Sequence, residues 1–288
     1  MTHQDTTSQL PTLSSRVIDT HKGDYGRPLL VGGSRGMAGA IALAGMAALR
    51  SGAGTVTLGV ADNCLETVAS FEPAFMTAPL ACDAEGRLVV AAKDALKVLA
   101  DRATCIGCGP GLGRSSQITD LITWMYQLLP QPIVFDADAL HALAEHPDVL
   151  TKPGGIRILT PHTGEFQKLL NVYDLSREKL ELRAELMAAS HKIIICLKGH
   201  RTFVTDGHQS THNLTGNPGM ATGGSGDVLT GIVTALFCQG LTPLDAMRLA
   251  AHVHGLAGDL AADEVGQVSL NANDLLRHLP AAFLQLES

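Results

Sequence analysis

The sequence predicts one α/β unit in which helices cover both faces of a mostly parallel central sheet. Short apolar stretches alternate with helical stretches along the 288 residues, which is the pattern of repeated strand–helix units. The candidate strands are apolar at nearly every position, as expected when both faces of a parallel sheet are covered. Apolar residues make up 45% of the chain and aromatic residues only 4%, so the core must be aliphatic.

The candidate elements follow one another in the order that such a sheet requires. The candidate strands are Leu29–Val31, Thr55–Val60, Ala103–Ile106, Pro132–Phe135, Arg157–Leu159, Ile193–Leu197 and Thr202–Thr205. The candidate helices are Ala38–Ser51, Asp94–Ala100, Ser116–Leu129, Ala139–His146, Gly164–Asn171, Glu178–His191, Gly226–Gln239 and Pro243–Glu264. In such sheets the ligand lies outside the carboxyl ends of the strands, so the loops that follow strands are where functional residues are expected.

Composition excludes several classes of protein. The 21 basic and 28 acidic residues give a net charge of −7, which argues against nucleic-acid binding through a broad basic surface. The longest apolar run, residues 37–49, is shorter than the roughly 20 residues that a membrane span needs. The cysteine spacing and the absence of a signal-peptide pattern favour a reduced, cytoplasmic protein. We expect a loosely ordered leader over residues 1–20 and a single domain over residues 21–288.

The loop after the first candidate strand is rich in glycine and opens an alanine-rich helix. It reads Gly32-Gly33-Ser34-Arg35-Gly36-Met37-Ala38-Gly39-Ala40. Backbone N–H groups at a helix start attract anions, but no lysine follows the glycines, so a P-loop NTPase is disfavoured. The alternative is that small residues are needed only for packing of the helix on the sheet.

A second glycine loop follows the candidate strand that ends at Ile106, and it reads Gly107-Cys108-Gly109-Pro110-Gly111-Leu112-Gly113. Its glycines let a ligand approach the backbone, or they serve a turn that needs positive φ angles. Cys105 and Cys108 form a C-x-x-C pair. One such pair without a second is a weak indication of zinc, and no residue is assigned as a metal ligand.

Acidic and polar residues follow the next two candidate strands. Asp136 and Asp138 come directly after Phe135, and Thr160-Pro161-His162-Thr163-Gly164-Glu165 follows Leu159. A carboxylate at the end of a strand can hold a magnesium–phosphate group, whereas either aspartate can equally well cap the next helix. His162 can bind a ligand, or it can cap a helix together with Thr163.

The turn after the candidate strand Ile193–Leu197 reads Lys198-Gly199-His200-Arg201-Thr202. Its lysine and hydroxyl group can hold nucleotide phosphates, or they lie at a solvated hairpin tip. His208 and His212 in the next hairpin are expected at the surface. His252 and His254 are two residues apart in a helix and point in different directions, so metal chelation by this pair is not expected.

The strongest pattern precedes an apolar helix and reads Asn217-Pro218-Gly219-Met220-Ala221-Thr222-Gly223-Gly224-Ser225-Gly226-Asp227. The N–H groups of Gly224, Ser225 and Gly226 would form an anion hole aimed at a phosphoryl group. Asp227 would lie beside this hole, where it can take a proton from an attacking hydroxyl group. A simple N-capping aspartate does not need three neighbouring glycines, so the pattern favours phosphoryl transfer.

Taken together and in this order, the loops resemble the ribokinase-like superfamily. Six motifs carry a closer resemblance, to the bacterial ADP-dependent NAD(P)H-hydrate dehydratases: Lys22-Gly23-Asp24-Tyr25-Gly26 leading into Gly32-Gly33-Ser34, Gly109-Pro110-Gly111-Leu112-Gly113, Asp136-Ala137-Asp138-Ala139-Leu140, Thr160-Pro161-His162-Thr163-Gly164-Glu165, Lys198-Gly199, and Gly219-Met220-Ala221-Thr222-Gly223-Gly224-Ser225-Gly226-Asp227. The resemblance implies a ribokinase-like three-layer sandwich without a separate lid domain. It also implies an enzyme that converts the S epimer of hydrated NADH or NADPH (NADHX, NADPHX) to NADH or NADPH. ADP would be the phosphoryl donor, with AMP and phosphate as products.

The same resemblance implies roles for individual residues. Asp227 would deprotonate the hydroxyl group of the hydrate. The positions matching hydrate-binding residues are Ala40, Gly111, Gly113, His162 and Asp227. The positions implied for nucleotide binding are Lys198, Gly199, His200, Arg201, Thr202, Gly224, Ser225 and Gly226. Mg²⁺ is expected with the nucleotide, and Asp136 would be only an indirect ligand.

Two departures from the family pattern affect the expected partners and assembly. Many relatives carry an epimerase domain ahead of the matching region, whereas only residues 1–21 precede the match here. An NAD(P)H-hydrate epimerase is therefore expected on a separate chain, unless it is absent. Ser225 stands where relatives commonly have threonine, and it keeps the hydroxyl and the N–H group. Relatives also imply a homotetramer.

Two other functions fit the same motifs. A small-molecule kinase of the same superfamily, such as a hydroxyethylthiazole or hydroxymethylpyrimidine kinase, would use the same anion hole and Asp227. The two glycine loops on the substrate side are better suited to a large ligand that carries phosphate groups. A non-catalytic nucleotide-binding protein would keep the fold without needing Asp227.

Overall fold

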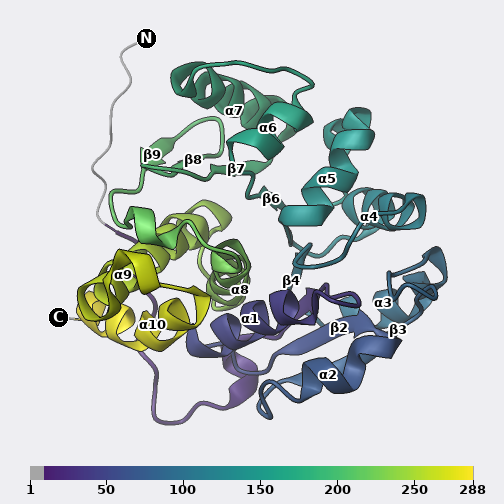
Figure 1. Ribbon diagram of the computed structural model, residues 1–288, viewed down its shortest axis with the longest axis horizontal. Coiled ribbons are helices and arrows are strands. Elements are labelled where there is room, and N and C mark those ends of the chain that lie inside the picture. Colours follow the sequence, from purple (N-terminus) through teal and green to yellow (C-terminus); the bar gives the residue numbers. More distant parts are fainter. Residues whose placement is uncertain (1–9, 288) are drawn as a thin grey trace.

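A mixed β-sheet forms the centre of the protein (Figure 1). Within residues 10–287, which the computed structural model describes, nine strands lie in the order β3-β2-β1-β4-β5-β6-β7-β8-β9. Their bounds are β1 Pro28–Val31, β2 Thr57–Ala61, β3 Met76–Leu80, β4 Cys105–Cys108, β5 Ile133–Phe135, β6 Arg157–Leu159, β7 Ile194–Leu197, β8 Phe203–Thr205 and β9 Ser210–His212. All pairs from β3 to β7 are parallel, and only β7–β8 and β8–β9 are antiparallel. The predicted mostly parallel sheet is confirmed.

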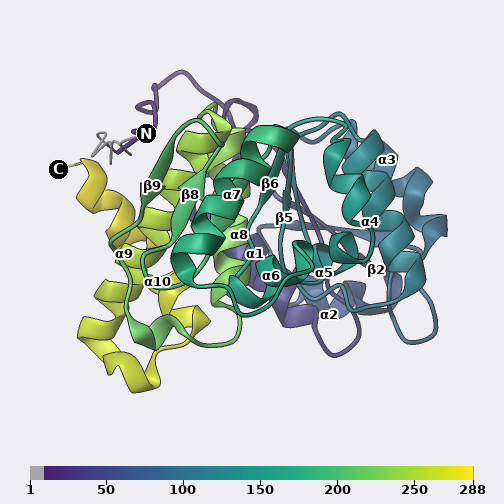
Figure 2. The ribbon, with the colours of Figure 1, turned by 90° about the horizontal axis from the view of Figure 1, so that it is seen from above.

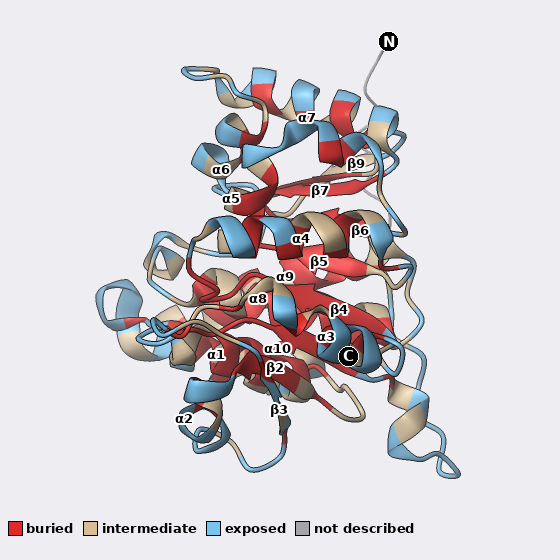
Figure 3. Cartoon of the chain, turned by 90° about the vertical axis from the view of Figure 1, so that its right-hand side faces the viewer, coloured by how far each residue is buried: buried red, intermediate tan, exposed pale blue. Residues whose placement is uncertain are grey.

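Helices cover both faces of the sheet, with α8–α10 on one side and α4–α7 on the other (Figures 1 and 2). Their bounds are α1 Ala38–Arg50, α2 Leu65–Ala69, α3 Lys93–Ala100, α4 Ser116–Leu128, α5 Ala137–Glu145, α6 Thr163–Leu169, α7 Arg177–His191, α8 Ser225–Cys238, α9 Pro243–Ser269 and α10 Ala272–Glu287. Val134 and Ile158 pack with α8–α10, whereas Phe135 and Leu159 pack with α4–α6. Because alternate side chains of a strand point to opposite faces, the continuously apolar strands fill two cores. Figure 3 shows this buried sheet between the exposed outer sides of the helices.

The sequence did not predict β3, β9, α2 or α10. β3 forms one edge of the sheet and exposes Met76 and Pro79. β9 forms the other edge, and its residues Ser210–His212 are only half-buried. An edge strand has a single neighbour and needs no continuous apolar run, so the pattern that identified the inner strands is missing here. α10 contains Pro280, which argues against a helix in the sequence alone.

Part of the expected leader lies against the domain. Residues 1–9 lie outside the described residues, and residues 10–20 form neither helix nor strand. Arg16 donates a hydrogen bond from Nη2 to the carbonyl oxygen of Gly52 at 2.6 Å and lies over the Tyr25 ring at 3.9 Å. Leu13 packs against the core beside α8–α10. Across residues 10–287, no helix is long and apolar enough to cross a bilayer.

Candidate active site

The loops after β1 and β4 meet where the strand order of the sheet reverses. β1 lies between β2 and β4, which makes this the topological switch point where ligands bind in α/β sheets. The N–H group of Gly33 donates to the Pro110 carbonyl oxygen at 2.8 Å, and that of Gly109 donates to the Val31 carbonyl oxygen at 3.1 Å. The structure therefore brings the two predicted glycine loops together.

Three of the predicted hydrate-binding positions lie at this junction. A Cβ atom at Gly111 would lie 3.1 Å from the Cβ atom of Ala40, and φ at Gly111 is +65°. Glycine is therefore required for this close packing. Gly113 donates its N–H group to the Asp138 carboxylate at 2.9 Å. Asp138 thus fixes the β4 loop from the first turn of α5.

The backbone around Asp136 is strained and tightly packed. Gly109 has a φ of +134°, and a Cβ atom there would overlap the carbonyl oxygen of Asp136. Ala137, the next residue, has a φ of +48°, in the left-handed region that residues with a side chain rarely adopt. Such strain persists where surrounding contacts determine the conformation, and it concentrates at functional sites.

Replacing Gly109 by alanine is expected to destabilise the protein by about 2 kcal/mol or more, because the added methyl group meets backbone that cannot move aside. Gly39→Ala is the matched control, since no atom lies within 4 Å of the added Cβ atom. Alanine there should leave the free energy of unfolding unchanged or raise it by up to about 1 kcal/mol. Urea unfolding measures both variants, and equal unfolding midpoints would contradict the close approach of Gly109 to Asp136.

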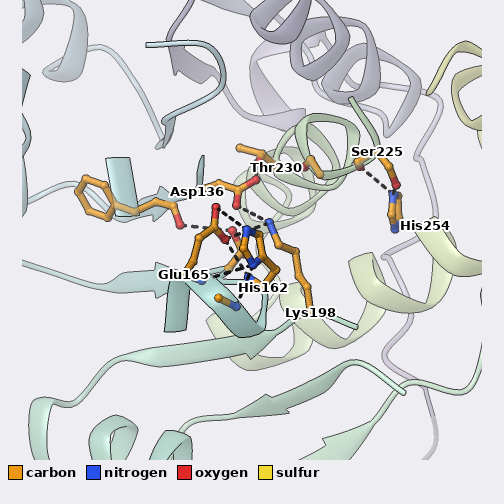
Figure 4. A network of polar contacts seen from close by, with 11 residues as sticks. Asp136, His162, Glu165, Lys198, Ser225, Thr230 and His254 are labelled. Atoms are coloured by element: carbon orange, nitrogen blue, oxygen red, sulfur yellow. Dashed lines mark hydrogen bonds and ion pairs between the residues drawn. The ribbon is translucent and has the colours of Figure 1, made fainter. Parts of the chain in front are cut away.

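Asp136 lies at the centre of a polar network (Figure 4). Only 1% of the residue is exposed. Its Oδ1 accepts a hydrogen bond from Lys198 Nζ at 2.6 Å, and its Oδ2 accepts one from Thr230 Oγ1 at 2.8 Å. Although Asp136 directly precedes α5, its side chain does not cap that helix. The alternative of a simple N-cap is therefore wrong for Asp136, which instead ties the end of β5 to α8.

Lys198 is shared between two carboxylates. Its Nζ also lies 4.0 Å from Glu165 Oε2. Burial disfavours the charged ammonium group, but Asp136 and Glu165 outweigh burial, and the pKa of Lys198 is raised. Burial also raises the pKa of Glu165. With 19% of its side chain exposed, Lys198 does not lie at a solvated hairpin tip, and that alternative is wrong.

His162 directly precedes α6 and caps it. Its Nδ1 accepts hydrogen bonds from the N–H groups of Gly164 at 3.0 Å and Glu165 at 3.3 Å. In return, Glu165 Oε2 accepts a hydrogen bond from the N–H group of His162 at 2.8 Å. The capping role is therefore confirmed. The side chain is still 61% exposed, so the cap leaves the ring accessible to a ligand.

The predicted anion hole lies at the start of α8. Gly224 is the N-cap residue with a φ of +90°, and Ser225, Gly226 and Asp227 form the first turn. The N–H groups of a first helical turn have no acceptor within the helix, so they are available to an anion. The N–H group of Ser225 already approaches the Thr222 carbonyl oxygen at 3.5 Å. Of the three predicted donors, Ser225 is therefore the one whose N–H group is already partly engaged.

His254 on α9 holds this helix start in place (Figure 4). Its Nε2 lies 2.9 Å from the carbonyl oxygen of Ser225 and 3.3 Å from the Ser225 hydroxyl group. A carbonyl oxygen can only accept, so Nε2 carries the hydrogen. Burial lowers the pKa of His254 to about 4, which keeps the ring neutral at physiological pH.

Asp227 is half-buried in the first turn of α8. Burial raises the pKa of its carboxyl group to about 7; the neighbouring Asp136 raises it further and Lys198 opposes the shift. A Cβ atom at Gly226 would lie 3.4 Å from Lys198 Nζ and 3.6 Å from Asp136 Oδ2, so this ion pair packs directly against the turn that carries Asp227. A carboxylate with a pKa near 7 is well suited to accept a proton at neutral pH.

The raised pKa of Asp227 predicts a pH-dependent stability. The pKa of this carboxyl group is 3.8 in the unfolded chain and about 7 in the folded protein. Its stabilising contribution is therefore fully present below about pH 4 and is lost as the pH rises through 7. Asp227→Asn removes this loss. The free energy of unfolding of the variant should therefore exceed that of the wild type by up to about 4 kcal/mol at pH 8 and equal it near pH 4. Urea unfolding at both pH values checks this, and a difference independent of pH would contradict it.

The predicted nucleotide-binding turn joins β7 to β8. Gly199 and Arg201 have φ angles of +144° and +54°, and Thr202 Oγ1 donates to the Gly199 carbonyl oxygen at 3.1 Å. The side chains of His200 and Arg201 are exposed. Lys198, at the start of the turn, points to Asp136, so the turn and the start of α8 lie on either side of the Asp136–Lys198 pair.

The C-x-x-C pair does not form a metal site. Cys105 and Cys108 are both buried on β4, and burial raises the pKa of each thiol. Three residues apart on a strand, they point to opposite faces of the sheet, and they pack in different cores. No group of three or more His, Cys, Asp or Glu side chains in the described part of the chain is arranged to hold a metal ion.

The sequence did not predict the contacts of Thr230 and His254 in the site, or the partial burial of His212. Thr230 is three residues after Asp227, so it shares a face of α8 with it; this spacing was the available signal. His254 contacts Ser225 across 29 residues, and no local pattern marks that contact. His212 was expected at the surface, but it is half-buried and its Nε2 lies 3.1 Å from Glu181 Oε2.

Comparisons with known proteins identify relatives of this chain. A model of the NAD(P)H-hydrate dehydratase family matches residues 28–281. The bifunctional NAD(P)H-hydrate repair enzyme Nnr of Moorella thermoacetica is 44% identical over 287 residues, covering 97% of this chain and 53% of that protein. The chain thus spans about half the length of the curated relatives it matches.

Solved structures of other proteins also match the chain. The ADP/ATP-dependent NAD(P)H-hydrate dehydratase from Bacillus subtilis, co-crystallized with ATP/Mg²⁺, is 31% identical with a TM-score of 0.80. The match covers 95% of this chain and 94% of that chain. A hydroxyethylthiazole kinase from Pyrococcus horikoshii shares only the fold, at 16% identity and a TM-score of 0.56 over 83% of this chain and 91% of that one.

Proposed function

Because the chain belongs to the NAD(P)H-hydrate dehydratase family, we propose that it dehydrates the S epimer of hydrated NADH or NADPH. ADP is the proposed phosphoryl donor, and AMP and phosphate are the products. One observation carries this proposal: Asp227, with a pKa of about 7, lies in the same helical turn as the free amides that would hold a phosphoryl group. A base beside an anion hole is the arrangement that phosphoryl transfer to a hydroxyl group requires.

The proposed reaction has two stages. Asp227 takes the proton of the hydrate hydroxyl group, whose oxygen attacks the terminal phosphorus of ADP and displaces AMP. The C–O bond of the phosphorylated ring carbon then breaks, the adjacent carbon loses a proton, and the ring double bond is restored. Phosphate leaves with the oxygen of the former hydroxyl group, so the atoms balance. Phosphorylation is useful because hydroxide is a poor leaving group.

The residues of the site divide between the two ligands. The hydrate would lie along Ala40, Gly111 and Gly113, where the two glycine loops allow close approach to the backbone, and it would reach His162. The nucleotide would lie along residues 198–202, with its terminal phosphate at residues 224–226. Asp136 holds the Lys198 ammonium group beside the turn that begins α8. This division is supported by the positions of the loops and by the family resemblance.

Mg²⁺ fits the site only together with the nucleotide. Lys198 and Thr230 already occupy both oxygens of Asp136, and residues 10–287 present no set of three or more metal-binding side chains. Mg²⁺ usually binds through one or two carboxylates together with substrate phosphates, so the nucleotide phosphates would supply most of its ligands and Asp136 would be only an indirect ligand. When bound, the ion would neutralise phosphate charge.

The proposed partner activity is an NAD(P)H-hydrate epimerase, which the resemblance implies and which would supply the S epimer. A homotetramer in the cytoplasm also stays a prediction. Light scattering on the purified chain tests the assembly.

Phosphate release distinguishes the proposal from a small-molecule kinase. The purified chain is incubated with hydrated NADH and ADP, and in parallel with hydroxyethylthiazole or hydroxymethylpyrimidine and ATP. The proposal predicts AMP and phosphate in the first reaction and no transfer in the second. A phosphorylated vitamin precursor in the second reaction, without phosphate release in the first, would favour the kinase.

A further inference from the structure

Arg177 joins the start of α7 to the turn that follows β7. Its Nη1 donates to the carbonyl oxygen of Lys198 at 3.1 Å, and its Nη2 donates to that of Leu197 at 2.9 Å. The carbonyl oxygen of Arg201 lies 3.5 Å from Nη2. One guanidinium group therefore spans three carbonyl groups at the two ends of the predicted nucleotide-binding turn.

The guanidinium group is itself held in place. Nε of Arg177 donates to Glu181 Oε1 at 2.8 Å, one helical turn further along α7. The other oxygen of Glu181 lies 3.1 Å from His212 Nε2 on β9. Glu181 therefore fixes the plane of the guanidinium group and links it to the hairpin that follows the turn.

Helix energetics do not explain an arginine at this position. Arg177 is the first residue of α7, where the positive end of the helix dipole disfavours a cation. Its side chain is only 26% exposed and reaches carbonyl groups outside its own helix. A planar guanidinium group donates in several fixed directions at once, which a lysine ammonium group cannot reproduce. The hydrogen bonds to the turn offset this unfavourable interaction with the helix dipole.

The captured carbonyl groups determine where the amides of the turn point. In a trans peptide, the carbonyl oxygen and the following N–H group point to opposite sides, and the described residues contain no cis peptide bond. Arg177 therefore directs the N–H groups of Gly199 and Thr202 away from α7. Gly199 has a φ of +144°, and a Cβ atom there would lie 3.1 Å from Nη1 of Arg177, so glycine is needed beside the guanidinium group.

We propose that Arg177 is a positioning residue for nucleotide binding, which holds residues 198–202 so that the amides of Gly199 and Thr202 face the phosphate groups of a nucleoside diphosphate. This inference rests on the proposed function, because that function places ADP at the turn. Arg177 makes no contact with the nucleotide in this role. Its removal should therefore change the affinity for ADP and not the chemical step.

Calorimetric titration of ADP into the full chain tests this role. Arg177→Lys and Arg177→Met should each raise the Kd for ADP about tenfold or more, since each loses hydrogen bonds from a charged donor. Glu181→Gln should raise it by a smaller factor. In turnover assays, KM for ADP should rise by a similar factor, while kcat and KM for the hydrate stay within about twofold. Arg183, exposed on the same helix, provides the matched control, and Arg183→Met should bind ADP like the wild type.

The outcomes separate this inference from the proposed function. Unchanged ADP affinity in a folded Arg177→Lys variant would overturn the positioning role and leave the proposed function standing. Failure of the wild type to bind ADP would overturn the proposed function, and the inference with it. If Arg177→Met does not fold, the lysine and Glu181→Gln variants still decide the question. Circular dichroism and the melting temperature establish folding in each case.

Discussion

Replacing Asp227 by asparagine is expected to lower kcat by about 100-fold or more, the usual contribution of a general base. The amide keeps the size of the side chain but does not take a proton from the hydrate hydroxyl group. Affinity for ADP should be largely kept, because the proposed phosphate donors at residues 224–226 are backbone amides. Turnover of hydrated NADH with saturating ADP measures the first effect, and calorimetry measures the second.

The pH profile and a matched control make this prediction specific. In the wild type, kcat/KM should rise as the pH increases through about 7, where the Asp227 carboxyl group loses its proton. Asp120→Asn is the control, because Asp120 is exposed on α4, and it should leave turnover unchanged. Normal turnover in a folded Asp227→Asn variant would refute the role of Asp227 as the base.

Replacing Lys198 by alanine is expected to have the largest effect on stability. It leaves the Asp136 carboxylate, which is 1% exposed, without its cation at 2.6 Å. Removing one partner of a buried ion pair typically costs about 3–5 kcal/mol of unfolding free energy. Loss of the ammonium group should also weaken ADP binding by about 1–3 kcal/mol. Urea unfolding and calorimetry at pH 7 measure these two effects.

A double variant separates the ion pair from general damage. Changing Lys198 to methionine and Asp136 to asparagine together removes both charges, so the double variant should be more stable than Lys198→Met alone. Lys97→Ala, at an exposed position on α3, controls for loss of a lysine and should stay within about 0.5 kcal/mol of the wild type. A Lys198→Ala variant with wild-type stability and wild-type ADP affinity would show that the pair has neither role.

The central sheet was predictable because its inner strands meet one physical requirement. Strands such as Ile133–Phe135 are buried on both faces, so nearly every position is apolar. The edge strands β3 and β9 have solvent on one side and carry Pro79 or polar residues. Their pairing depends on the rest of the sheet rather than on their own pattern, and the sequence therefore did not predict them.

The candidate site divides in the same way between local and distant features. The anion hole and Asp227 are contiguous in the chain, so their glycine pattern was visible. The contacts of Asp136 span 62 residues to Lys198 and 94 residues to Thr230, and only the fold brings these side chains together. For this reason the sequence left open whether Asp136 is a helix cap and whether Lys198 lies at a solvated tip. The structure contradicts both of these alternatives.

The most direct test of the proposed dehydration is the absorbance of NADH at 340 nm. The purified chain is mixed with hydrated NADH and Mg²⁺, and with ADP, with ATP or without nucleotide. The proposal predicts that absorbance returns with ADP and stays flat without nucleotide. No return of absorbance with either nucleotide, in protein shown to be folded, would contradict the proposed dehydratase activity.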